Sequence, residues 1–175
     1  MPATQIVYLS LGSNLGDRAA FIERAIAALG DAGVRVVRRS AIYETEPVDA
    51  PAQGMFLNLV VEAETGLAPR ALLVALLGIE RSLGRERIVP RGPRTIDIDI
   101  LLYGSSVVRE AGLAIPHPSM AARRFVLVPL AEIAPGVRHP VLGGTIAELA
   151  AACRDANRVG AWRPGDDGDN PSGTA

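Results

Sequence analysis

Two aspartates, Asp97 and Asp99, lie in a segment whose other residues are typical of a β-strand. In RTIDIDILLYG, residues 94–104, apolar residues alternate with a second set: Ile96, Ile98, Ile100 and Leu102 alternate with Asp97, Asp99, Leu101 and Tyr103. Side chains two positions apart on a strand point to the same face, so the two carboxylates share a face, with Cα atoms about 6.6 Å apart. Aspartate is depleted in strands and like charges on one face repel, so the pair calls for an explanation.

Two explanations of the carboxylate pair stay open from the residues alone. One face of an antiparallel sheet can be solvated, and aspartates on such a face need no function. Alternatively, the two carboxylates flank a pair of divalent ions, which in two-metal sites lie about 3.5–4 Å apart. Leu101 and Tyr103 continue the aspartate face in the predicted strand, so that face is not simply polar, which favours the metal site.

Arginines are concentrated just before the aspartate strand. All 18 basic residues of the chain are arginine, and five of them fall in RSLGRERIVPRGPR, residues 81–94, beside a single acidic residue. Genome composition is a sufficient reason for the total, but not for the clustering. The absence of lysine excludes a P-loop lysine, a protein-kinase lysine and a Schiff base. Because arginine binds phosphate through a rigid two-pronged fork, the cluster predicts a phosphate site.

Three other motifs each allow a structural and a functional interpretation. GSNLGD, residues 12–17, is either a glycine turn with a helix cap or a phosphate-contacting loop, and it fits neither the dinucleotide nor the P-loop pattern. IPHPSMAARRF, residues 115–125, holds His117, Arg123 and Phe125, and we favour a second part of a polyphosphate site over a structural histidine with solvated arginines. In MFLNLV, Phe56 and Asn58 share a strand face, which suits either a core or a pocket for a flat heterocycle.

Composition indicates an ordinary globular protein. The 175 residues are 49% hydrophobic and 21% charged with a net charge of −1, so we expect one domain over residues 1–163 and a disordered tail over 164–175. There is no long apolar run and no signal-peptide pattern, which predicts a cytoplasmic protein without a membrane segment. The single cysteine, Cys153, excludes an intramolecular disulfide and a cysteine-rich zinc site.

The order of the expected elements indicates the fold class. Hydrophobic periodicity predicts, in turn, a strand, helix, strand, strand, helix and strand, at residues 5–11, 17–29, 34–45, 55–64, Pro69 to Gly84, and the aspartate segment. This βαββαβ order is typical of an α+β, ferredoxin-like sheet with helices on one face. A further helix is expected at residues 145–154.

Six short motifs in the same order resemble a known enzyme family. GSNLGD, YETEPV, FLN, GRERI, GPRTIDIDIL and PHPSMAARRF are together similar to 6-hydroxymethyl-7,8-dihydropterin pyrophosphokinase, also called 2-amino-4-hydroxy-6-hydroxymethyldihydropteridine diphosphokinase. The resemblance spans roughly residues 5–150. It implies an αβα sandwich on the ferredoxin-like core, with C-terminal additions. It also implies transfer of the β,γ-diphosphate of ATP to the hydroxymethyl group of the dihydropterin, with release of AMP, in tetrahydrofolate biosynthesis.

The resemblance also implies roles for individual residues. Asp97 and Asp99 match the residues that hold two Mg²⁺ ions and, with Arg85 and Arg94, are the expected catalytic group. The positions that match ATP contacts are Glu80, Arg85, Arg87, Arg94, His117 and Arg123. Those that match the pterin pocket are Thr45, Val48, Phe56, Asn58 and Phe125. Two residues depart from the family pattern, since Arg91 and Pro118 stand where many members have an aromatic residue.

We expect a monomer that binds small molecules and no nucleic acid, but two rivals remain. A Mg-dependent nucleotidyltransferase also combines a GS turn with an Asp-x-Asp pair, although there the two lie close together in sequence, unlike Ser13 and Asp97. The other rival is a non-catalytic ferredoxin-like binding module, since this sheet also carries RNA-recognition domains. The aromatic content of this chain, 4%, argues against RNA recognition.

Overall fold

The computed structural model describes residues 3–47, 54–85 and 94–166. Two of the candidate site residues, Val48 and Arg87, lie outside these ranges, as do Arg91 and residues 167–175 of the expected tail.

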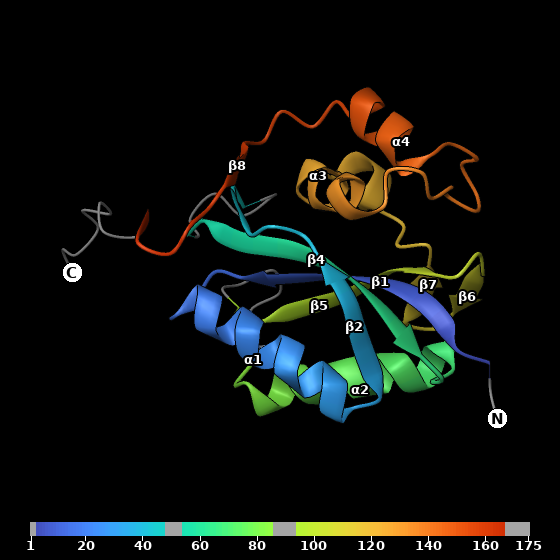
Figure 1. Ribbon diagram of the computed structural model, residues 1–175, viewed down its shortest axis with the longest axis horizontal. Coiled ribbons are helices and arrows are strands. Elements are labelled where there is room, and N and C mark those ends of the chain that lie inside the picture. The colour runs from blue at the N-terminus through green and yellow to red at the C-terminus, as the bar shows by residue number, and fades with distance from the viewer. Residues whose placement is uncertain (1–2, 48–53, 86–93, 167–175) are drawn as a thin grey trace.

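An antiparallel sheet forms the middle layer of the molecule (Figure 1). Its strands run in the order β5 (Asp97–Tyr103), β1 (Gln5–Ser13), β4 (Phe56–Thr65), β3 (Tyr43–Thr45) and β8 (Val159–Ala161), and β2 (Val34–Arg39) also pairs with β4. All of these pairings are antiparallel. The two central strands, β1 and β4, are flanked by β5 on one side and by β2 and β3 on the other, which confirms the α+β fold class and the ferredoxin-like strand order.

Helices cover both faces of the sheet (Figure 1). On one face lie α1 (Arg18–Asp31) and α2 (Pro69–Ser82), and on the other lie α3 (Arg124–Ile133) and α4 (Ile146–Ala152). Each interface has its own buried core, one including Leu9, Leu59 and Leu72 and the other Tyr8, Val60 and Leu130. The element order predicts helices on one face only, whereas the αβα sandwich implied by the resemblance is present.

The second face is built from the part of the chain that follows β5. A hairpin of β6 (Val108–Glu110) and β7 (Leu113–Ile115) leads into the 3-10 helix η1 (Met120–Ala122) and then into α3. The short helix α4 corresponds to the helix expected at residues 145–154, and β8 closes the outer edge of the sheet beside β3.

Local signals place the two helices of the first face. Asp17 caps α1, because its carboxylate accepts a hydrogen bond of 3.2 Å from the N–H of Ala20. Pro69 is the first residue of α2, where its missing N–H removes no helical bond. Gly84 follows the helix with a φ of 87°, a conformation that glycine adopts without strain.

The strand expected over residues 34–45 is in fact two strands, β2 and β3. Between them Ser40 is buried, and its hydroxyl accepts a hydrogen bond of 3.0 Å from the N–H of Val60 in β4. The same hydroxyl donates to the carbonyl of Ala41 at 2.8 Å. The Ser40 hydroxyl therefore takes the place of a backbone carbonyl as the acceptor for Val60, and regular strand pairing is interrupted between β2 and β3.

A bulge changes the far end of the aspartate strand. Leu9 of β1 pairs with Ile100 and Tyr8 with Leu102, so Leu101 is an extra residue in β5. Tyr103 consequently turns to the face covered by α1 and α2, where its hydroxyl donates to the carbonyl of Leu67 at 2.5 Å. The expectation that Tyr103 shares the aspartate face is therefore wrong, since strict alternation ends at the bulge.

Helix α3 is not predicted from the sequence, because Pro129 lies inside it. A proline in a helix interior removes a backbone hydrogen bond and normally ends the helix. Here Val126 and Leu130 are buried in one core with Tyr8 and Val60 of the sheet, so tertiary packing outweighs the local penalty.

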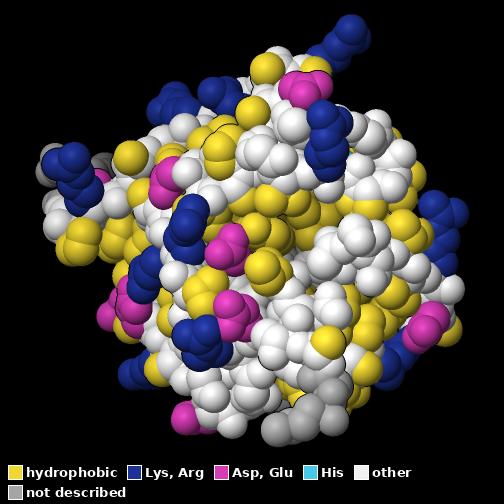
Figure 2. All heavy atoms as spheres, turned by 45° about the vertical axis from the view of Figure 1, so that its right-hand side comes forward, with side chains coloured by type: hydrophobic (Ala, Val, Ile, Leu, Met, Phe, Trp, Pro, Cys, Tyr) yellow, Lys and Arg dark blue, Asp and Glu magenta, His cyan; other side chains and the backbone are white. Residues whose placement is uncertain are grey.

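The molecular surface shows where apolar side chains remain accessible. On the face shown in Figure 2, hydrophobic side chains gather in a band across the middle, surrounded by basic and acidic ones. Large hydrophobic residues that are exposed come from β1, β2, α2 and intervening loops: Ile6, Leu15, Val37, Val74, Val107, Val141 and Leu142. None of the helices in the described part of the chain is long and apolar enough to cross a membrane.

Candidate active site

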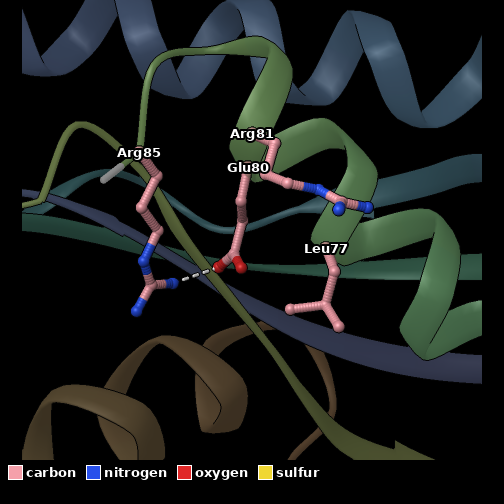
Figure 3. A pocket seen from close by; sticks show the side chains of 4 residues that line it. All are labelled: Leu77, Glu80, Arg81 and Arg85. Carbon is pink, nitrogen blue, oxygen red and sulfur yellow. Dashed lines mark hydrogen bonds and ion pairs between the residues drawn. The ribbon is translucent and has the colours of Figure 1, made fainter. Parts of the chain in front are cut away.

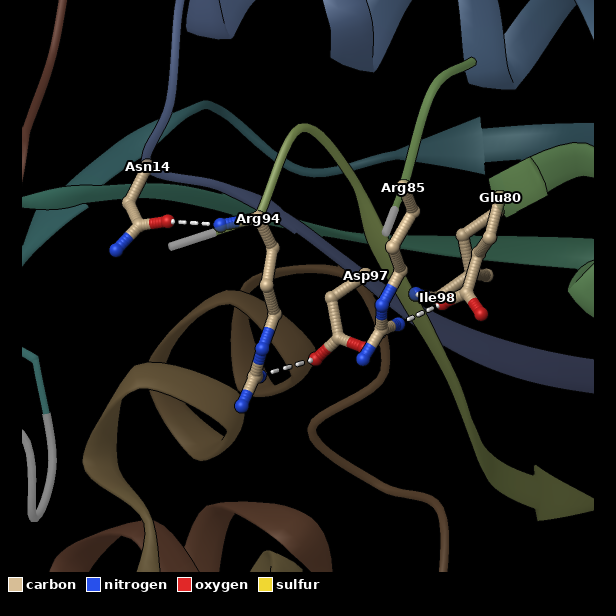
Figure 4. Close-up of polar contacts among 6 residues, drawn as sticks. All are labelled: Asn14, Glu80, Arg85, Arg94, Asp97 and Ile98. Carbon is tan, nitrogen blue, oxygen red and sulfur yellow. Dashed lines mark hydrogen bonds and ion pairs between the residues drawn. The ribbon is translucent and has the colours of Figure 1, made fainter. Parts of the chain in front are cut away.

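Asp97 is held between two arginines at the start of β5 (Figure 4). Arg85 Nη1 donates a hydrogen bond of 2.6 Å to Asp97 Oδ1, and Arg94 Nη1 donates one of 3.1 Å to Asp97 Oδ2. The side chains of Asp97 and Arg85 are only 22% and 12% exposed. Two guanidinium groups are thus concentrated around one carboxylate at low exposure, where charge interactions are screened less than on an open surface.

Glu80 fixes Arg85 from helix α2 (Figure 4). Its side chain is 3% exposed, and its Oε2 accepts hydrogen bonds from Arg85 and, at 3.0 Å, from the N–H of Ile98. Burial raises the pKa of Glu80, although these hydrogen bonds and the charge of Arg85 act in the opposite direction. Because β5 is an edge strand, the bond to Ile98 also satisfies a backbone group that the sheet leaves unpaired.

Asn14 places Arg94, and sequence reasoning does not single it out. The side-chain oxygen of Asn14 accepts a hydrogen bond of 2.7 Å from the backbone N–H of Arg94. The backbone N–H of Asn14 donates to the backbone carbonyl of Arg94 at 3.1 Å. The two bonds join the residue after β1 to the residue that approaches β5, as Figure 4 shows for the side-chain bond. The available signal is the position of Asn14 in GSNLGD, directly after a strand, so this motif contributes to the site by positioning an arginine.

Asp99 lies on the same face as Asp97, beneath α3. The neighbouring Ile98 and Ile100 point into the opposite core, which leaves the aspartates on the α3 face. Burial and repulsion from Asp97 raise the pKa of Asp99 to about 7, against the attraction of Arg123. The charged form of Asp99 is therefore less stable here than it would be in water.

His117 and Arg123 join the carboxylates from the segment before α3. The backbone N–H of His117 donates to the carbonyl of Leu101 at 3.0 Å, and its Nδ1 accepts from the N–H of Ser119 at 3.1 Å. In the neutral imidazole the proton is therefore on Nε2, which can donate. Burial and the charge of Arg123 lower the pKa of His117, against the attraction of Asp97.

A second group of candidate residues surrounds Asn58 on the same face of the sheet. Asn58 Nδ2 donates to Thr45 Oγ1 at 2.6 Å, and both side chains are buried. Gly12 lies beside them, since an added Cβ would overlap Asn58 Oδ1 and lie 3.6 Å from Cδ1 of Phe56. Gly12 pairs with Asn58 on one side and with Asp97 on the other, and its lack of a side chain leaves room for the amide of Asn58.

Phe125 approaches from α3. It is the second residue of the helix, and the guanidinium carbon of Arg123 lies 5.6 Å from the centre of its ring, a cation–π contact. Phe125 is half-buried against the core beneath α3, whereas Phe56 belongs to the sheet itself. That the two rings enclose one ligand stays a prediction.

A cavity of about 400 Å³ lies at the C-terminal end of α2 (Figure 3). Leu77, Glu80, Arg81 and Arg85 line it, combining one apolar wall with charged groups. The volume falls in the range of small-molecule sites, roughly 300–1,000 Å³. Since Arg85 lines the cavity and also bonds to Asp97, it joins the cavity to the carboxylate pair.

Asp97 and Asp99 are the described residues that could hold a metal ion. In the described part of the chain, no group of three or more histidine, cysteine, aspartate and glutamate side chains could hold an ion by itself. Two carboxylates suit Mg²⁺, which is commonly bound by one or two carboxylates together with phosphate oxygens and water. A cation beside the pair would stabilise the charged form of Asp99, which burial disfavours.

Comparisons with known proteins identify the family. The profile of the 7,8-dihydro-6-hydroxymethylpterin-pyrophosphokinase family matches residues 8–135. The 2-amino-4-hydroxy-6-hydroxymethyldihydropteridine pyrophosphokinase of Methylorubrum extorquens is 46% identical over 153 residues, 87% of this chain and 95% of the relative. The protein of the same name from Bacillus subtilis is 43% identical over 159 residues, 90% of each chain.

Longer proteins contain a matching region. The chain is 43% identical to part of the folic acid synthesis protein fol1 of Pneumocystis carinii and spans only 19% of that protein's length. Its fold is similar to that of wild-type Plasmodium falciparum HPPK-DHPS, with a TM-score of 0.69 at 18% identity over 86% of this chain and 44% of the other. The sequence matches over most of the chain, together with this fold, show that the chain belongs to the 7,8-dihydro-6-hydroxymethylpterin-pyrophosphokinase family.

Proposed function

We propose that the site around Asp97 transfers the β,γ-diphosphate of ATP to the hydroxymethyl oxygen of 6-hydroxymethyl-7,8-dihydropterin and releases AMP. The family consists of ATP-using pterin pyrophosphokinases of folate biosynthesis, and this chain is one of them. The single observation that carries the residue assignment is the row Asp97, Gly12 and Asn58 on three adjacent strands. It places a charged, arginine-rich group and a buried amide on one face of the sheet, with one strand between them.

On the nucleotide side, the arginines would exchange partners. Arg85 and Arg94 bond to Asp97 in the described structure, and a triphosphate offers them oxygens that suit the same two-pronged geometry. Arg123, the residue before α3, adds a third positive charge, which attracts Asp99. We place the nucleoside end of ATP toward the cavity that Leu77, Glu80, Arg81 and Arg85 line, because Arg85 connects that cavity to the phosphates. Arg87, implied by resemblance, lies outside the described residues.

On the metal side, Asp97 and Asp99 would hold two Mg²⁺ ions. When bound, such ions neutralise charge on the transferring phosphates and orient the attacking oxygen. The exchange of partners described above would release Asp97 for this role. Asp99 needs no such release in this account, since burial and then the charge of Asp97 destabilise its carboxylate, which a cation would stabilise.

On the pterin side, the buried amide would read the edge of the heterocycle. Because Asn58 Nδ2 is bonded to Thr45, its Oδ1 is the atom presented toward Gly12, and it can accept a hydrogen bond from a ring N–H. Phe56 and Phe125 would stack on the two sides of the ring. Val48, which also matches a pterin-pocket position, lies outside the described residues.

The arrangement supplies positioning and charge without a strong base. Phosphoryl transfer asks the protein mainly to align the groups and to stabilise charge on the phosphate oxygens. His117 fits that requirement, since its lowered pKa keeps it neutral near pH 7 and its Nε2–H can donate to a phosphate oxygen. The described residues therefore account for an in-line transfer between two bound substrates.

The decisive experiment is to measure nucleotide products with Mg-ATP in the presence and absence of 6-hydroxymethyl-7,8-dihydropterin. We expect AMP and a diphosphorylated pterin only when the pterin is present. Release of free diphosphate with a nucleotidylated product would indicate a nucleotidyltransferase instead. No consumption of ATP with the pterin present would favour a non-catalytic binding module.

A further inference from the structure

The segment after α4 is not used by the site described above, yet it contacts two parts of it. Residues 153–162, which we call the strap, run from the end of α4 past α3 to β8 at the edge of the sheet (Figure 1). Its first contact is made by Asp155. Asp155 Oδ2 accepts a hydrogen bond of 3.0 Å from the backbone N–H of Arg124.

That bond caps helix α3 from a distance. The first N–H groups of a helix have no partner within the helix, and the N-cap residue usually supplies one with its side chain. The N-cap residue of α3, Arg123, makes no such bond. Asp155, 31 positions away, bonds to the N–H of the first helical residue instead, and a carboxylate is also favourable at this positive end of the helix.

The position of the capping carboxylate is itself fixed. Asp155 Oδ1 accepts hydrogen bonds from Asn157, at 3.0 Å from the backbone N–H and 2.7 Å from Nδ2. Partial burial acts to raise the pKa of Asp155, but the bonds from Asn157 and Arg124 outweigh it and lower the pKa. The carboxylate is therefore charged and held on both oxygens at neutral pH.

The other end of the strap is attached to β3. Val159 pairs with Thr45 and Ala161 with Tyr43, and the N–H of Trp162 donates to the carbonyl of Ile42 at 2.9 Å. Trp162 is 9% exposed and belongs to the core beneath α1 and α2. Thr45 is the partner of Asn58, so this end of the strap is paired with the strand that carries one wall of the proposed pterin pocket.

We propose that the strap sets the width of the pterin pocket, and that Asp155 is the positioning residue at its α3 end. This inference rests on the proposed function. One end of a ten-residue segment is bonded to the start of α3, which carries Arg123 and Phe125, and the other end is paired with the strand that carries Thr45. Asp155 acts through the helix start and touches neither substrate in this account.

The test is the affinity for 6-hydroxymethyl-7,8-dihydropterin, titrated in the presence of Mg²⁺ and a non-hydrolysable ATP analogue. Asp155→Ala should weaken pterin binding roughly fivefold, the factor that corresponds to the loss of a typical helix cap. Asp155→Asn should bind within about twofold of wild type, because asparagine caps helices about as well as aspartate. Backbone hydrogen exchange at residues 124–127 should become faster in Asp155→Ala and stay slow in Asp155→Asn.

Asp166→Ala is the matched control. Asp166 also accepts a hydrogen bond from a backbone N–H, that of Arg163 at 2.7 Å, but it lies beyond the strap. The pterin affinity of the Asp166→Ala variant should equal that of wild type. If Asp155→Ala does not fold, Asn157→Ala serves in its place, since it removes the 2.7 Å donor and should give a smaller increase in the pterin dissociation constant.

Two failures can be told apart. If wild-type protein does not bind the pterin, the proposed function fails. If wild type binds it and Asp155→Ala binds equally well while only its melting temperature falls, the strap is merely structural and the inference is overturned.

Discussion

The two carboxylates of β5 have different partners although they are two positions apart. Asp97 bonds to Arg85 and Arg94, whereas burial and the charge of Asp97 raise the pKa of Asp99 to about 7. A neutral amide at either position has nearly the same shape but cannot bind a cation with comparable strength. The roles of both residues can therefore be tested by isosteric substitution.

Asp97→Asn and Asp99→Asn should each remove most turnover and leave the fold intact. Loss of a metal ligand costs several kcal/mol of transition-state stabilisation, which corresponds to a decrease on the order of 10³-fold or more. AMP formation at saturating Mg²⁺ measures the effect, and the melting temperature checks the fold. Near-wild-type turnover in either variant would refute the two-metal assignment.

Gly12→Ala should weaken pterin binding more than Mg-ATP binding. The added Cβ would overlap Asn58 Oδ1, and the buried Asn58 has little room to move because it is bonded to Thr45. Overpacking of this kind typically costs about 1–3 kcal/mol, hence roughly 5- to 150-fold if all of it appears in pterin affinity. Gly30→Ala is a suitable control, since nothing lies within 4 Å of a Cβ at that position. Equal pterin affinity in both variants would show that the position of the Asn58 amide over Gly12 does not matter for pterin binding.

At the scale of elements, the start of α3 carries much of the site. It brings together Arg123, whose charge acts on Asp99, and Phe125, whose ring Arg123 contacts, and it is capped by a residue from a different part of the chain. The helix exists despite Pro129 because its apolar side is buried. Its position is therefore determined by tertiary contacts, and substitutions at its first turn should affect ligand binding before they affect the fold.

Phe125→Ala should weaken pterin binding by about 2–3 kcal/mol, or roughly 30- to 150-fold. The loss combines ring stacking with lost apolar burial, and Mg-ATP affinity should change little. Isothermal titration with each ligand separates the two. Phe21→Ala is a matched control, because Phe21 on α1 makes a similar contact with Arg24, at 5.8 Å, on the opposite face of the sheet. Loss of ATP binding with pterin binding kept would move Phe125 to the nucleotide site.

At the scale of the whole molecule, local signals in the sequence predict the parts that depend on neighbouring residues. The cap at Asp17, the start of α2 at Pro69 and the alternation around Asp97 are all present as expected. The βαββαβ order follows from such segments, and so does the strand order of the sheet.

The parts that sequence reasoning misses depend on contacts between distant residues. The break at Ser40 and the bulge at Leu101 each require a partner strand, and α3 requires the sheet beneath it. The bonds of Asn14 to Arg94 join residues 80 positions apart, so no spacing rule reveals them. Roles of the site residues came instead from the resemblance, and the structure adds the geometry that makes those roles testable.

We expect the strap to make stability depend on pH in the acid range. The pKa of Asp155 is lowered in the folded protein, so its contribution is fully present above the ordinary value of 3.8 and is lost as the pH falls through the lower, folded value. The free energy of unfolding of wild type should therefore approach that of Asp155→Asn as the pH falls below 3.8. Urea unfolding of both proteins at a series of pH values measures this, and a constant difference between them would contradict the expectation.

The oligomeric state also belongs to this scale, and we expect a monomer. In residues 3–47, 54–85 and 94–166, the exposed large hydrophobic residues are divided among several elements. Light scattering on the eluting protein should give the 18.4 kDa of one chain at micromolar concentration. A mass near twice that value would show that a dimer forms.

Gly12 has a consequence for how substrate preference in this chain can change. Asp97 and Asn58 are separated by the width of two strand pairings, roughly 9–10 Å, and this separation belongs to the backbone ladder. No side-chain substitution alters this spacing between the strands. New preferences can therefore arise by lengthening or shortening the groups that reach inward from it, whereas a substrate whose reactive oxygen lies at a different distance from its ring edge would require a different sheet.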